Sequence, residues 1–410
     1  MPRNAAIVGI GGFANNHHVA LRELENQGRV RLIATCDPRI AGLGDLVTAL
    51  DFGGRGVSIE ENFKTLLEKH AGRLGLVAIP APIHLHAPMH AACVARGLPC
   101  YLEKPPSLNP AELAEMVRID DPSRPTAVGF QYLASPAVRS LKRRIVKGEF
   151  GRLLSVELLG LWPRGQDYYQ RNQWAGRLSL NGNLVLDSCA GNAMSHHVMN
   201  ILFYAGTGGE ASLARPLSVT AQLYRANPIQ GADTVFAEFE LEGGVRGRIA
   251  LSHAIDTTAE TVETLVFETT RIEIRPGRGI SIMPASGVET ILEFPGAGTL
   301  QSFSHYLDFL EGKEPRPAAT LSDCTGFVDL NALLYLATNG IGNMPSVRSA
   351  RREGGPLVHV PELADVCRRF AREGEWPQSQ SEDWAIRGGR AGFPEISGLR
   401  DRVTALAGAR

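Results

Sequence analysis

The sequence predicts two domains, an α/β domain with a doubly wound parallel sheet and then an α+β domain with a large, mainly antiparallel open sheet. In residues 1–130, apolar runs of strand length alternate with helical stretches, as in successive βαβ units. After residue 150, strand-like runs follow one another with only turns between them, which favours antiparallel pairing. The length of 410 residues and the apolar content of 44% also suit two hydrophobic cores.

The first predicted strand runs directly into a glycine loop. Residues 5–14 form an apolar run that ends in Gly9-x-Gly11-x-x-Ala14, and a helix is expected over 16–27. Gly9 allows a tight turn, Gly11 lets backbone approach a pyrophosphate, and the small Ala14 lets the helix pack against the strand. The order of strand, glycines and helix predicts a dinucleotide-binding (Rossmann) loop. The predicted cofactor contacts here are Gly9, Gly11, Gly12, Phe13 and Ala14.

An acidic residue ends the second predicted strand. The apolar run Val30–Cys36 leads to Asp37, which lies 23 residues beyond Ala14. A carboxylate at this place accepts hydrogen bonds from the ribose hydroxyls and repels a 2′-phosphate, so NAD is favoured over NADP. Arg39 keeps NADP open as an alternative, and we count both Asp37 and Arg39 as cofactor-binding.

A lysine follows the strand of a later βαβ unit. The apolar run 74–79 breaks at Pro80-Ala81-Pro82, a helix is predicted over 86–96, and a second apolar run, 98–102, leads into Glu103-Lys104-Pro105. Lys104 is therefore expected at the carboxyl end of a parallel strand, where open α/β sheets bind ligands. The alternative is a surface lysine beside a turn.

The pattern of elements changes beyond residue 131. A last strand of the first domain is expected over 126–131, a helix over 136–147, and helices over 301–312 and 321–340. The strands expected between them are 153–161, 217–223, 234–240, 247–252, 264–268 and 271–274. The predicted domains are therefore 1–130, 131–340 and a peripheral C-terminal extension, 341–410, with helices near 361–373 and 397–407.

Residues 181–200 carry the second cluster of reactive side chains. On a helix expected from about Ala190, Asn192 and His196 share one face, His197 points about 100° away, and Asp187 precedes the helix. A polar pair beside a carboxylate can orient a substrate hydroxyl and relay its proton, since histidine titrates near neutrality. The alternative is a buried core histidine, with Asp187 or Ser188 capping the helix.

A segment rich in arginine and aromatic residues directly precedes this cluster. It contains Arg164, Tyr168, Tyr169, Arg171, Trp174 and Arg177. Aromatic faces stack on sugar rings, and arginines bind hydroxyls or carboxylates. We expect a substrate-recognition loop here, and an oligomer contact is the alternative.

Composition excludes several classes of protein. The net charge of −1 without long runs of like charge argues against a nucleic-acid partner. No apolar run is long enough to span a bilayer and no charged-and-apolar signal segment opens the chain, so we expect a soluble, cytoplasmic protein. The six cysteines show no Cys-x-x-Cys spacing and are expected to be reduced and buried. His84, His86 and His90 cluster without acidic or cysteine ligands, so no metal site is predicted.

Together these motifs resemble the glucose-fructose oxidoreductase, inositol dehydrogenase and rhizopine-catabolism (Gfo/Idh/MocA) family. The resemblance rests on the glycine loop, the acid after the second strand, Pro82 and His86, Glu103-Lys104-Pro105, and a polar-x-x-x-His helix. It covers roughly residues 4–340 and is strongest over 4–131. It implies a Rossmann domain followed by a second domain with an open sheet, and proton-transferring or substrate-orienting roles for Lys104 and His196.

The chain departs from the family pattern at the second motif. The aspartate expected four residues before His196 is Asn192, and the nearest carboxylate, Asp187, lies nine before it. An asparagine can orient a hydroxyl but cannot take its proton, so the acid/base work would fall on Lys104 and His196. Alternatively, a bulged helix start brings Asp187 into the place of the aspartate. The chain also lacks an arginine that many members carry near Tyr132-Leu133.

The site predicted from motifs and resemblance has three groups of residues. The catalytic group is Lys104, His196, Asp187 and Asn192. The further cofactor contacts are Pro80, Pro82, His86, Glu103 and Lys104. The substrate contacts are Gln131, Tyr168, Trp174, Arg177 and His197.

These features lead to the hypothesis of an NAD-dependent oxidoreductase that acts on a CH–OH group of a carbohydrate or polyol. A homo-oligomer, dimer or tetramer, is expected through the open sheet of the second domain. One alternative is a redox-neutral, NAD-dependent enzyme that cleaves glycosides. The other is a non-enzymatic NAD-binding sensor or co-repressor, against which the presence of both Lys104 and His196 argues.

Overall fold

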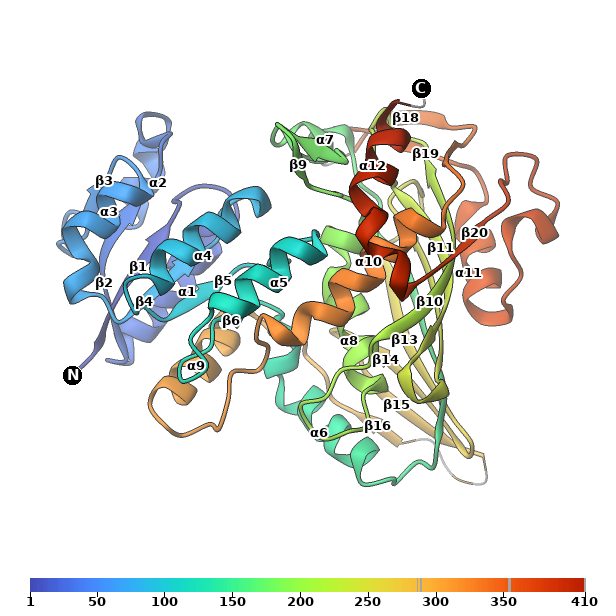
Figure 1. The fold of residues 1–410 in the computed structure, drawn as a ribbon, viewed down its shortest axis with the longest axis horizontal. Helices are drawn as coiled ribbons and strands as arrows, with labels where there is room; N and C mark the ends of the chain where they lie inside the picture. Colours follow the sequence, from blue (N-terminus) through green and yellow to red (C-terminus); the bar gives the residue numbers. More distant parts are fainter. Residues whose placement is uncertain (286, 288–289, 353–354, 409–410) are drawn as a thin grey trace. The chain divides into compact units, whose positions relative to one another are not determined.

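The computed structural model describes residues 1–285, 287, 290–352 and 355–408, and it divides the chain into two compact units (Figure 1). Unit 1 consists of residues 1–107, 111–136 and 297–324, and unit 2 of residues 108–110, 137–296 and 325–410. Residues 297–324 thus return to the first unit, whereas 341–410 belong to the second unit instead of standing apart from it.

Unit 1 is built on a six-stranded sheet with the order β3-β2-β1-β4-β5-β6. All of its neighbouring strands pair in parallel, and the chain order reverses between β1 and β4, which is the topological switch point of a doubly wound sheet. The strands are β1 (Arg3–Val8), β2 (Val30–Cys36), β3 (Ser58–Glu60), β4 (Leu76–Ile79), β5 (Cys100–Leu102) and β6 (Ala127–Val128). The sheet order confirms the predicted fold class of the first domain.

Five α-helices connect these strands. They are α1 (Ala14–Asn26), α2 (Gly44–Ala49), α3 (Phe63–His70), α4 (His86–Val94) and α5 (Pro110–Ile119). The strand expected over 126–131 is shorter than predicted, because residues Gln131–Ala134 turn into a 3₁₀ helix (η4).

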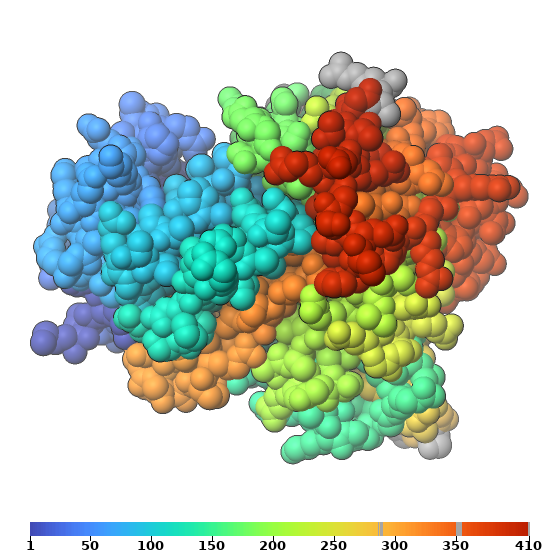
Figure 2. Space-filling view, in the orientation of Figure 1, coloured from blue at the N-terminus to red at the C-terminus, as the bar shows by residue number. Residues whose placement is uncertain are grey.

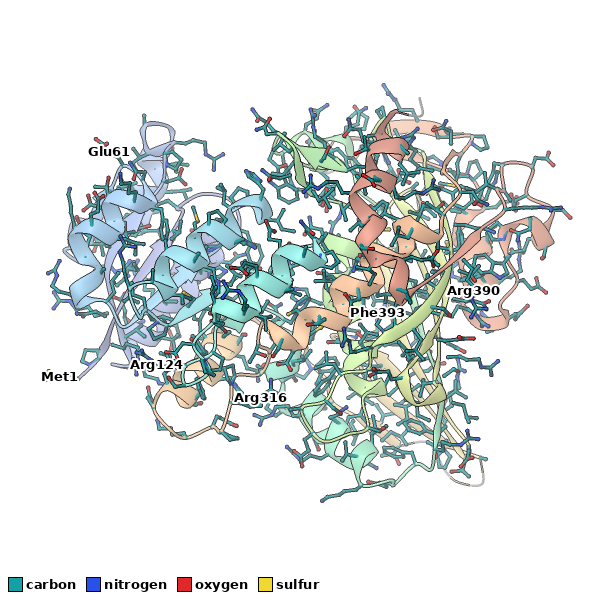
Figure 3. All side chains as sticks on the ribbon, viewed as in Figure 1. Met1, Glu61, Arg124, Arg316, Arg390 and Phe393 are labelled. Carbon is teal, nitrogen blue, oxygen red and sulfur yellow. The ribbon has the colours of Figure 1, made fainter. Side chains whose placement is uncertain are left out.

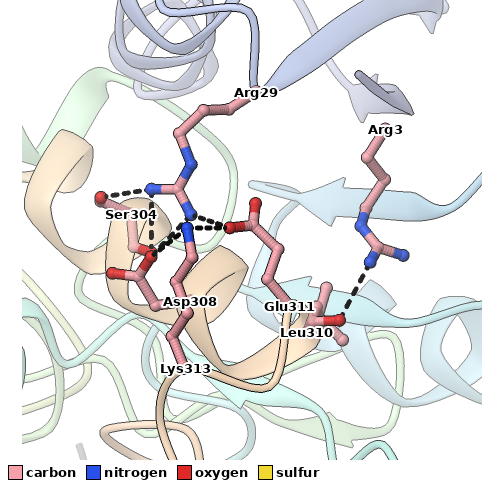
Figure 4. A network of polar contacts seen from close by, with 7 residues as sticks. All are labelled: Arg3, Arg29, Ser304, Asp308, Leu310, Glu311 and Lys313. Carbon is pink, nitrogen blue, oxygen red and sulfur yellow. Dashed lines mark hydrogen bonds and ion pairs between the residues drawn. The ribbon is translucent and has the colours of Figure 1, made fainter. Parts of the chain in front are cut away.

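Helix α9 (Thr299–Leu310) explains why residues 297–324 belong to unit 1. Its apolar residues Phe303 and Tyr306 are buried in the same core as Leu21 of α1, and Phe303 stacks on Tyr101 with ring centroids 4.0 Å apart. On the polar side, Arg29 bridges α1 and β2 to the helix (Figure 4). Its partners are the carboxylates of Asp308 at 2.7 Å and Glu311 at 3.0 Å and the hydroxyl of Ser304 at 2.7 Å.

Unit 2 is built on a ten-stranded mixed sheet with the order β16-β15-β14-β13-β7-β12-β11-β10-β17 and β20 beside β10. Most neighbours are antiparallel, as predicted, but β7 with β12 and β10 with β17 are parallel. Its strands are β7 (Leu153–Leu161), β10 (Pro216–Arg225), β11 (Thr234–Leu241), β12 (Arg246–Ser252), β13 (Glu260–Phe267), β14 (Thr270–Arg275), β15 (Gly279–Pro284), β16 (Thr290–Leu292), β17 (Ile341–Asn343) and β20 (Gly389–Gly392).

Short elements complete this unit. The two hairpins are β8 (Ser179–Leu180) with β9 (Asn183–Leu184), and β18 (Val347–Arg352) with β19 (Gly355–His359). The helices are α6 (Pro136–Val146), α7 (Gln166–Gln170), α8 (Ser195–Ala205), α10 (Thr325–Ala337), α11 (Leu363–Glu373) and α12 (Leu399–Gly408).

Helices cover the two faces of the large sheet differently. In Figure 1, α8 and α10 lie on one face and α11 lies on the other. Helix α11 buries Val366, Cys367 and Phe370 in one core with Leu159 of β7 and Phe236 of β11. Helix α11 of the C-terminal extension therefore covers the apolar part of this sheet face. The core that it forms with β7 and β11 belongs to unit 2.

The end of the chain lies over the same unit. Figure 2 shows the C-terminal residues, in red, spread over its surface. In Figure 3, Arg390 and Phe393 mark the segment around β20, where Arg390 donates to Ser218 (2.9 Å) and contacts Glu240 (3.0 Å). Arg390 also lines a polar pocket on the large sheet, together with Glu157 of β7 and Arg246 of β12.

Two global expectations can be compared with the described residues. Cys36, Cys93, Cys100, Cys189, Cys324 and Cys367 are all free and buried, as predicted. In the described part of the chain, no helix combines the length and the apolar surface needed to cross a membrane.

Candidate active site

The glycine loop joins the end of β1 to the start of α1. Gly9 (φ 104°) and Gly12 (φ 60°) adopt left-handed backbone conformations that side chains disfavour, and a Cβ on Gly9 would lie only 3.2 Å from that of Ala14. The loop ends at Phe13, whose ring is exposed, and α1 then begins at Ala14. The predicted loop thus has the geometry that a pyrophosphate-binding turn requires, at the switch point of the sheet.

Asp37 holds the glycine loop by a hydrogen bond to its backbone at Ile10. It lies just after β2 and is buried, and its two oxygens accept hydrogen bonds from the backbone N–H of Ile10 (3.1 Å) and of Arg39 (2.9 Å). The Arg39 side chain is exposed and lies 3.6 Å from the same carboxylate. Asp37 therefore ties the glycine loop to the end of β2, where an adenosine ribose is expected.

Two consecutive histidines, which the sequence reasoning missed, anchor α1 to the surrounding loops. Nε2 of His18 donates to the Gly9 carbonyl at 2.9 Å, and burial lowers the pKa of His18 to about 4. Nε2 of His17 donates to the Glu103 carboxylate at 3.0 Å, and both side chains are buried. The signal was the His-His pair one helical turn after the glycines.

Lys104 lies two residues beyond the end of β5, as predicted. The Glu103 carboxylate accepts the backbone N–H of Lys104 at 3.0 Å through Oε2, while Oε1 contacts His17. A side chain on Gly129 would come within 2.9 Å of Glu103, so this glycine makes room for the carboxylate. The Lys104–Pro105 peptide bond is cis. We call Glu103-Lys104-Pro105 the lysine loop. The Glu103 carboxylate supports this loop through its bond to the backbone of Lys104, and His17 holds the carboxylate in place.

His86 connects the loops that follow β4 and β5. Its ring is buried, with Nε2 2.8 Å from the carbonyl oxygen of Ala81 and Nδ1 3.0 Å from that of Pro105. Burial lowers its pKa, and the carbonyl contacts oppose this effect. Pro80 is partly exposed and Pro82 exposed, so they line the accessible side of the first loop.

Gln131 lies in η4, where its side-chain amide donates to the carbonyl of Ala297 at 3.0 Å. This hydrogen bond fastens the start of the returning segment to the rest of unit 1. A contact of Gln131 with substrate stays a prediction.

The second motif of the sequence adopts an unexpected backbone. Residues Cys189–Ala193 form a π-helical turn capped by Ser188, and α8 begins only at Ser195. The predicted single helix from Ala190 through His196 is therefore wrong, and the argument from four-residue spacing does not apply to Asn192 and His196. Such π turns often occur at functional sites.

The π turn instead joins Asn192 to Asp187. The amide of Asn192 donates to Oδ1 of Asp187 at 2.7 Å, and the Gly176 N–H donates to Oδ2 at 2.6 Å. Asp187 is buried, and its carboxylate is 3.8 Å from the guanidinium of Arg171. The two residues that the sequence offered as alternatives thus form one hydrogen-bonded pair at the start of α8.

The two histidines of α8 have different surroundings. His196 in the first turn is partly exposed, whereas His197 is buried. Nδ1 of His197 lies 2.6 Å from the carboxylate of Glu263 on β13, which also accepts the Asn200 amide at 2.8 Å. The edge of Trp162 packs on His197 with centroids 5.6 Å apart. Glu263 and Asn200 were not identified from the sequence, because their pairing exists only once α8 lies on the sheet.

The segment after β7 forms a ladder of alternating aromatic and guanidinium groups. We call Trp162, Arg164, Tyr168, Arg171 and Trp174 the arginine–aromatic ladder. Arg164 lies over the rings of Trp162 (5.4 Å) and Tyr168 (5.0 Å), and Arg171 lies over Tyr168 (3.7 Å) and Trp174 (5.1 Å). Of the predicted substrate contacts, Tyr168 and Trp174 thus belong to one stack, while Arg177 is exposed beside it.

The described residues contain no group of three or more His, Cys, Asp or Glu side chains able to hold a metal ion. The clustered histidines have other partners: His86 contacts backbone carbonyls, and His90 lies 3.1 Å from Asp120.

The sheet order and the glycine loop of unit 1 define the class of protein, one with a dinucleotide-binding Rossmann domain. Residues 3–124 match the model of the oxidoreductase family with the NAD-binding Rossmann fold, Gfo/Idh/MocA. This match covers the Rossmann part of the chain, which is NAD-binding and of the oxidoreductase type, and it agrees with the resemblance found in the sequence over this part.

Similar solved structures share the fold at low sequence identity. The WlbA dehydrogenase from Bordetella pertussis, in complex with NADH and UDP-GlcNAcA, is 20% identical with a TM-score of 0.66, over 82% of this chain and 96% of that chain. A levoglucosan dehydrogenase in complex with NADH is 15% identical with a TM-score of 0.67, over 82% and 96%. An oxidoreductase from Agrobacterium radiobacter in complex with NAD⁺, L-tartaric acid and magnesium is 16% identical with a TM-score of 0.66, over 82% and 96%. A search of curated sequences finds no match.

Proposed function

We propose that the protein is an NAD-dependent dehydrogenase that oxidises a CH–OH group of a sugar, polyol or related compound. The observation that carries the proposal is the lysine loop: Lys104 stands at the carboxyl end of β5 in a Rossmann sheet, on a backbone held by the buried Glu103. The similar WlbA and levoglucosan dehydrogenases, whose structures hold NADH, support a sugar-type substrate for this chain.

The cofactor assignment rests on the groups that surround the glycine loop. The backbone of Gly9–Phe13 and the start of α1 are suited to the pyrophosphate, and Asp37 to the ribose hydroxyls. A buried carboxylate at Asp37 disfavours a 2′-phosphate, so we propose NAD over NADP. When bound, NAD⁺ accepts the hydride that leaves the substrate carbon.

The protein supplies the acid/base groups. Lys104 in its neutral form, or His196, accepts the one proton of the substrate hydroxyl as its carbon loses hydride and the C=O bond forms, and the same group returns it in the reverse reaction. Asp187 and Asn192 orient the hydroxyl as a pair, with the asparagine amide holding the carboxylate. Gln131, Tyr168, Trp174 and Arg177 are the proposed substrate-side contacts, and buried His197 is proposed to position Trp162, on which it packs.

Lys104 provides the test of the proposal. Lys104→Ala is expected to lower kcat for NAD-linked sugar oxidation by about 100-fold or more, because general acid–base groups contribute that much. The dissociation constant of NAD, measured by calorimetry, is expected to change less than about threefold.

Lys147→Ala removes an exposed lysine of unit 2 and serves as the control. Full turnover by Lys104→Ala would disprove the role of the lysine. A folded wild-type protein that binds neither NAD nor NADP would disprove the proposed function.

We also propose a cytoplasmic protein that assembles with copies of itself. The six buried free thiols support a reducing compartment such as the cytoplasm, because thiols stay reduced there. The surface that we propose for a partner copy is the polar pocket on the large sheet, which Glu157, Glu238, Arg246 and Arg248 line.

A further inference from the structure

Arg164 is a rigidly held cation. Its backbone N–H donates to the carbonyl of His253 at 3.2 Å, and its guanidinium lies over Trp162 and Tyr168, 5.4 and 5.0 Å from the ring centroids. Stacking on two rings fixes the plane of the guanidinium and leaves its N–H edge as the group that can meet a ligand.

The charge of Arg164 has no counterion among the described residues. The neighbouring Arg171 has a carboxylate, Asp187, at 3.8 Å, but no Asp or Glu oxygen lies within 4.0 Å of Arg164 in the described ranges. Nε of Arg164 is buried and has no hydrogen-bond acceptor among the residues that the structure describes. A partly buried guanidinium without acceptors is costly, so an arrangement that holds it there points to an anion from outside.

A second unpartnered group lies beside it. His253 is buried, its Nδ1 donates to the carbonyl of Trp162 at 2.8 Å, and its Nε2 has no partner among the described residues. Burial lowers the pKa of His253 to about 3, so the ring is neutral at physiological pH and Nε2 is an acceptor. The local charge therefore comes from Arg164, and a hydroxyl donor on the same ligand would suit Nε2.

Two members of the arginine–aromatic ladder contact the segment that carries His196. Trp162 packs on His197, the neighbour of His196, and Arg171 faces Asp187. A ligand bound to Arg164 would thus lie in unit 2 beside the start of α8.

We propose that Arg164 binds an anionic group of the substrate, so that the substrate is an acidic sugar instead of a neutral one. A carboxylate and a phosphate both present the paired oxygens that a guanidinium binds in bidentate fashion. This inference rests on the proposed function, since it names the class of substrate for the same site.

The experiment compares matched neutral and acidic sugars on wild type, Arg164→Gln, Arg164→Lys and Arg143→Gln. NAD reduction is measured with glucose, glucuronate and glucose 6-phosphate, and with galactose and galacturonate. Wild type should prefer an acidic sugar over its neutral counterpart in kcat/KM. Arg164→Gln should raise KM for the acid about 10- to 100-fold, with kcat changed less than about threefold.

The other variants separate charge from geometry. Arg164→Lys keeps the charge but loses the planar fork, so an intermediate KM is expected. Arg143→Gln removes an exposed arginine of α6 and should behave like wild type. A higher kcat/KM of wild type for glucuronate than for glucose 6-phosphate indicates a carboxylate on the substrate, and the reverse order indicates a phosphate.

A binding readout keeps this inference distinct from the proposed function. Quenching of tryptophan fluorescence, to which Trp162 and Trp174 contribute, should saturate with glucuronate or glucose 6-phosphate, not with glucose, and should be lost in Arg164→Gln. If wild type binds these anions but oxidises no sugar, the anion site at Arg164 stands and the proposed function fails. Equal kcat/KM for neutral and acidic sugars, unchanged in Arg164→Gln, or no saturable response to either anion, would overturn the inference.

Discussion

Histidines give the site much of its internal order at the scale of single residues. His17 holds Glu103 under the lysine loop, and His18 holds the carbonyl of Gly9 in the glycine loop. Because these residues are consecutive on α1, one turn of this helix contacts both the glycine loop and the lysine loop. Neighbouring positions in the sequence could suggest such anchors, but their partners, 9 and 86 residues away, appear only in the folded chain.

His18 predicts a loss of stability in acid. Its folded pKa is lowered to about 4 by burial, whereas the unfolded value is 6.5. As the pH falls below 6.5, the unfolded chain takes up a proton that the folded chain refuses, so stability decreases between pH 6.5 and about 4. The full effect is about 3 kcal/mol.

Urea unfolding between pH 7.5 and 4.5 measures this effect. In His18→Gln, whose amide can still donate to the Gly9 carbonyl, the fall in unfolding free energy should be smaller than in wild type. Parallel pH profiles for the two proteins would contradict the assignment.

The helix α8 depends on an unusual cap at its carboxyl end. Lys142 is fully buried on α6, and its ammonium donates to the carbonyl oxygens of Phe203, Gly206 and Ser212. These carbonyls belong to the last turn of α8 and the loop beyond it, so one lysine satisfies acceptors that a helix end leaves open.

Lys142→Met is therefore expected to destabilise unit 2 by about 3 kcal/mol, since three buried carbonyls lose their donor. Chemical denaturation followed by circular dichroism measures the change. Arg143→Met, at the exposed neighbouring position, should change the unfolding free energy by less than about 0.5 kcal/mol. Equal stability of the two variants would show that the cap contributes nothing.

At the same scale, the start of α8 marks where prediction from sequence failed. Strands such as Val30–Cys36 and Leu153–Leu161 matched their apolar runs, because burial on a sheet imposes a simple pattern. The π turn at Cys189–Ala193 has no such periodic signature, and its contacts, the Ser188 cap and the hydrogen bond from Asn192 to Asp187, appear only in the folded chain. The sequence indicated that Asp187 and Asn192 lie near each other, but it predicted the wrong backbone between them.

The fold of the whole molecule was more predictable in its classes of structure than in its connections. The glycine loop and alternating elements indicated the doubly wound sheet, and successive strands indicated the second one. The return of α9 to unit 1 was not visible, because Phe303 and Tyr306 look like core residues of any domain. Likewise, the apolar face of α11 shows that the helix is buried but not that the large sheet is its partner.

At the scale of the whole molecule, the proposed reaction is NAD-linked oxidation of an acidic sugar. The most direct measurement mixes the protein with NAD⁺ and the sugar panel, follows absorbance at 340 nm, and quantifies the sugar products by mass spectrometry. We expect NADH and a ketone or lactone product in a 1:1 ratio, with acidic sugars preferred. Consumption of a glycoside without net NADH would contradict it, as would the absence of any reaction in a chain that binds NAD.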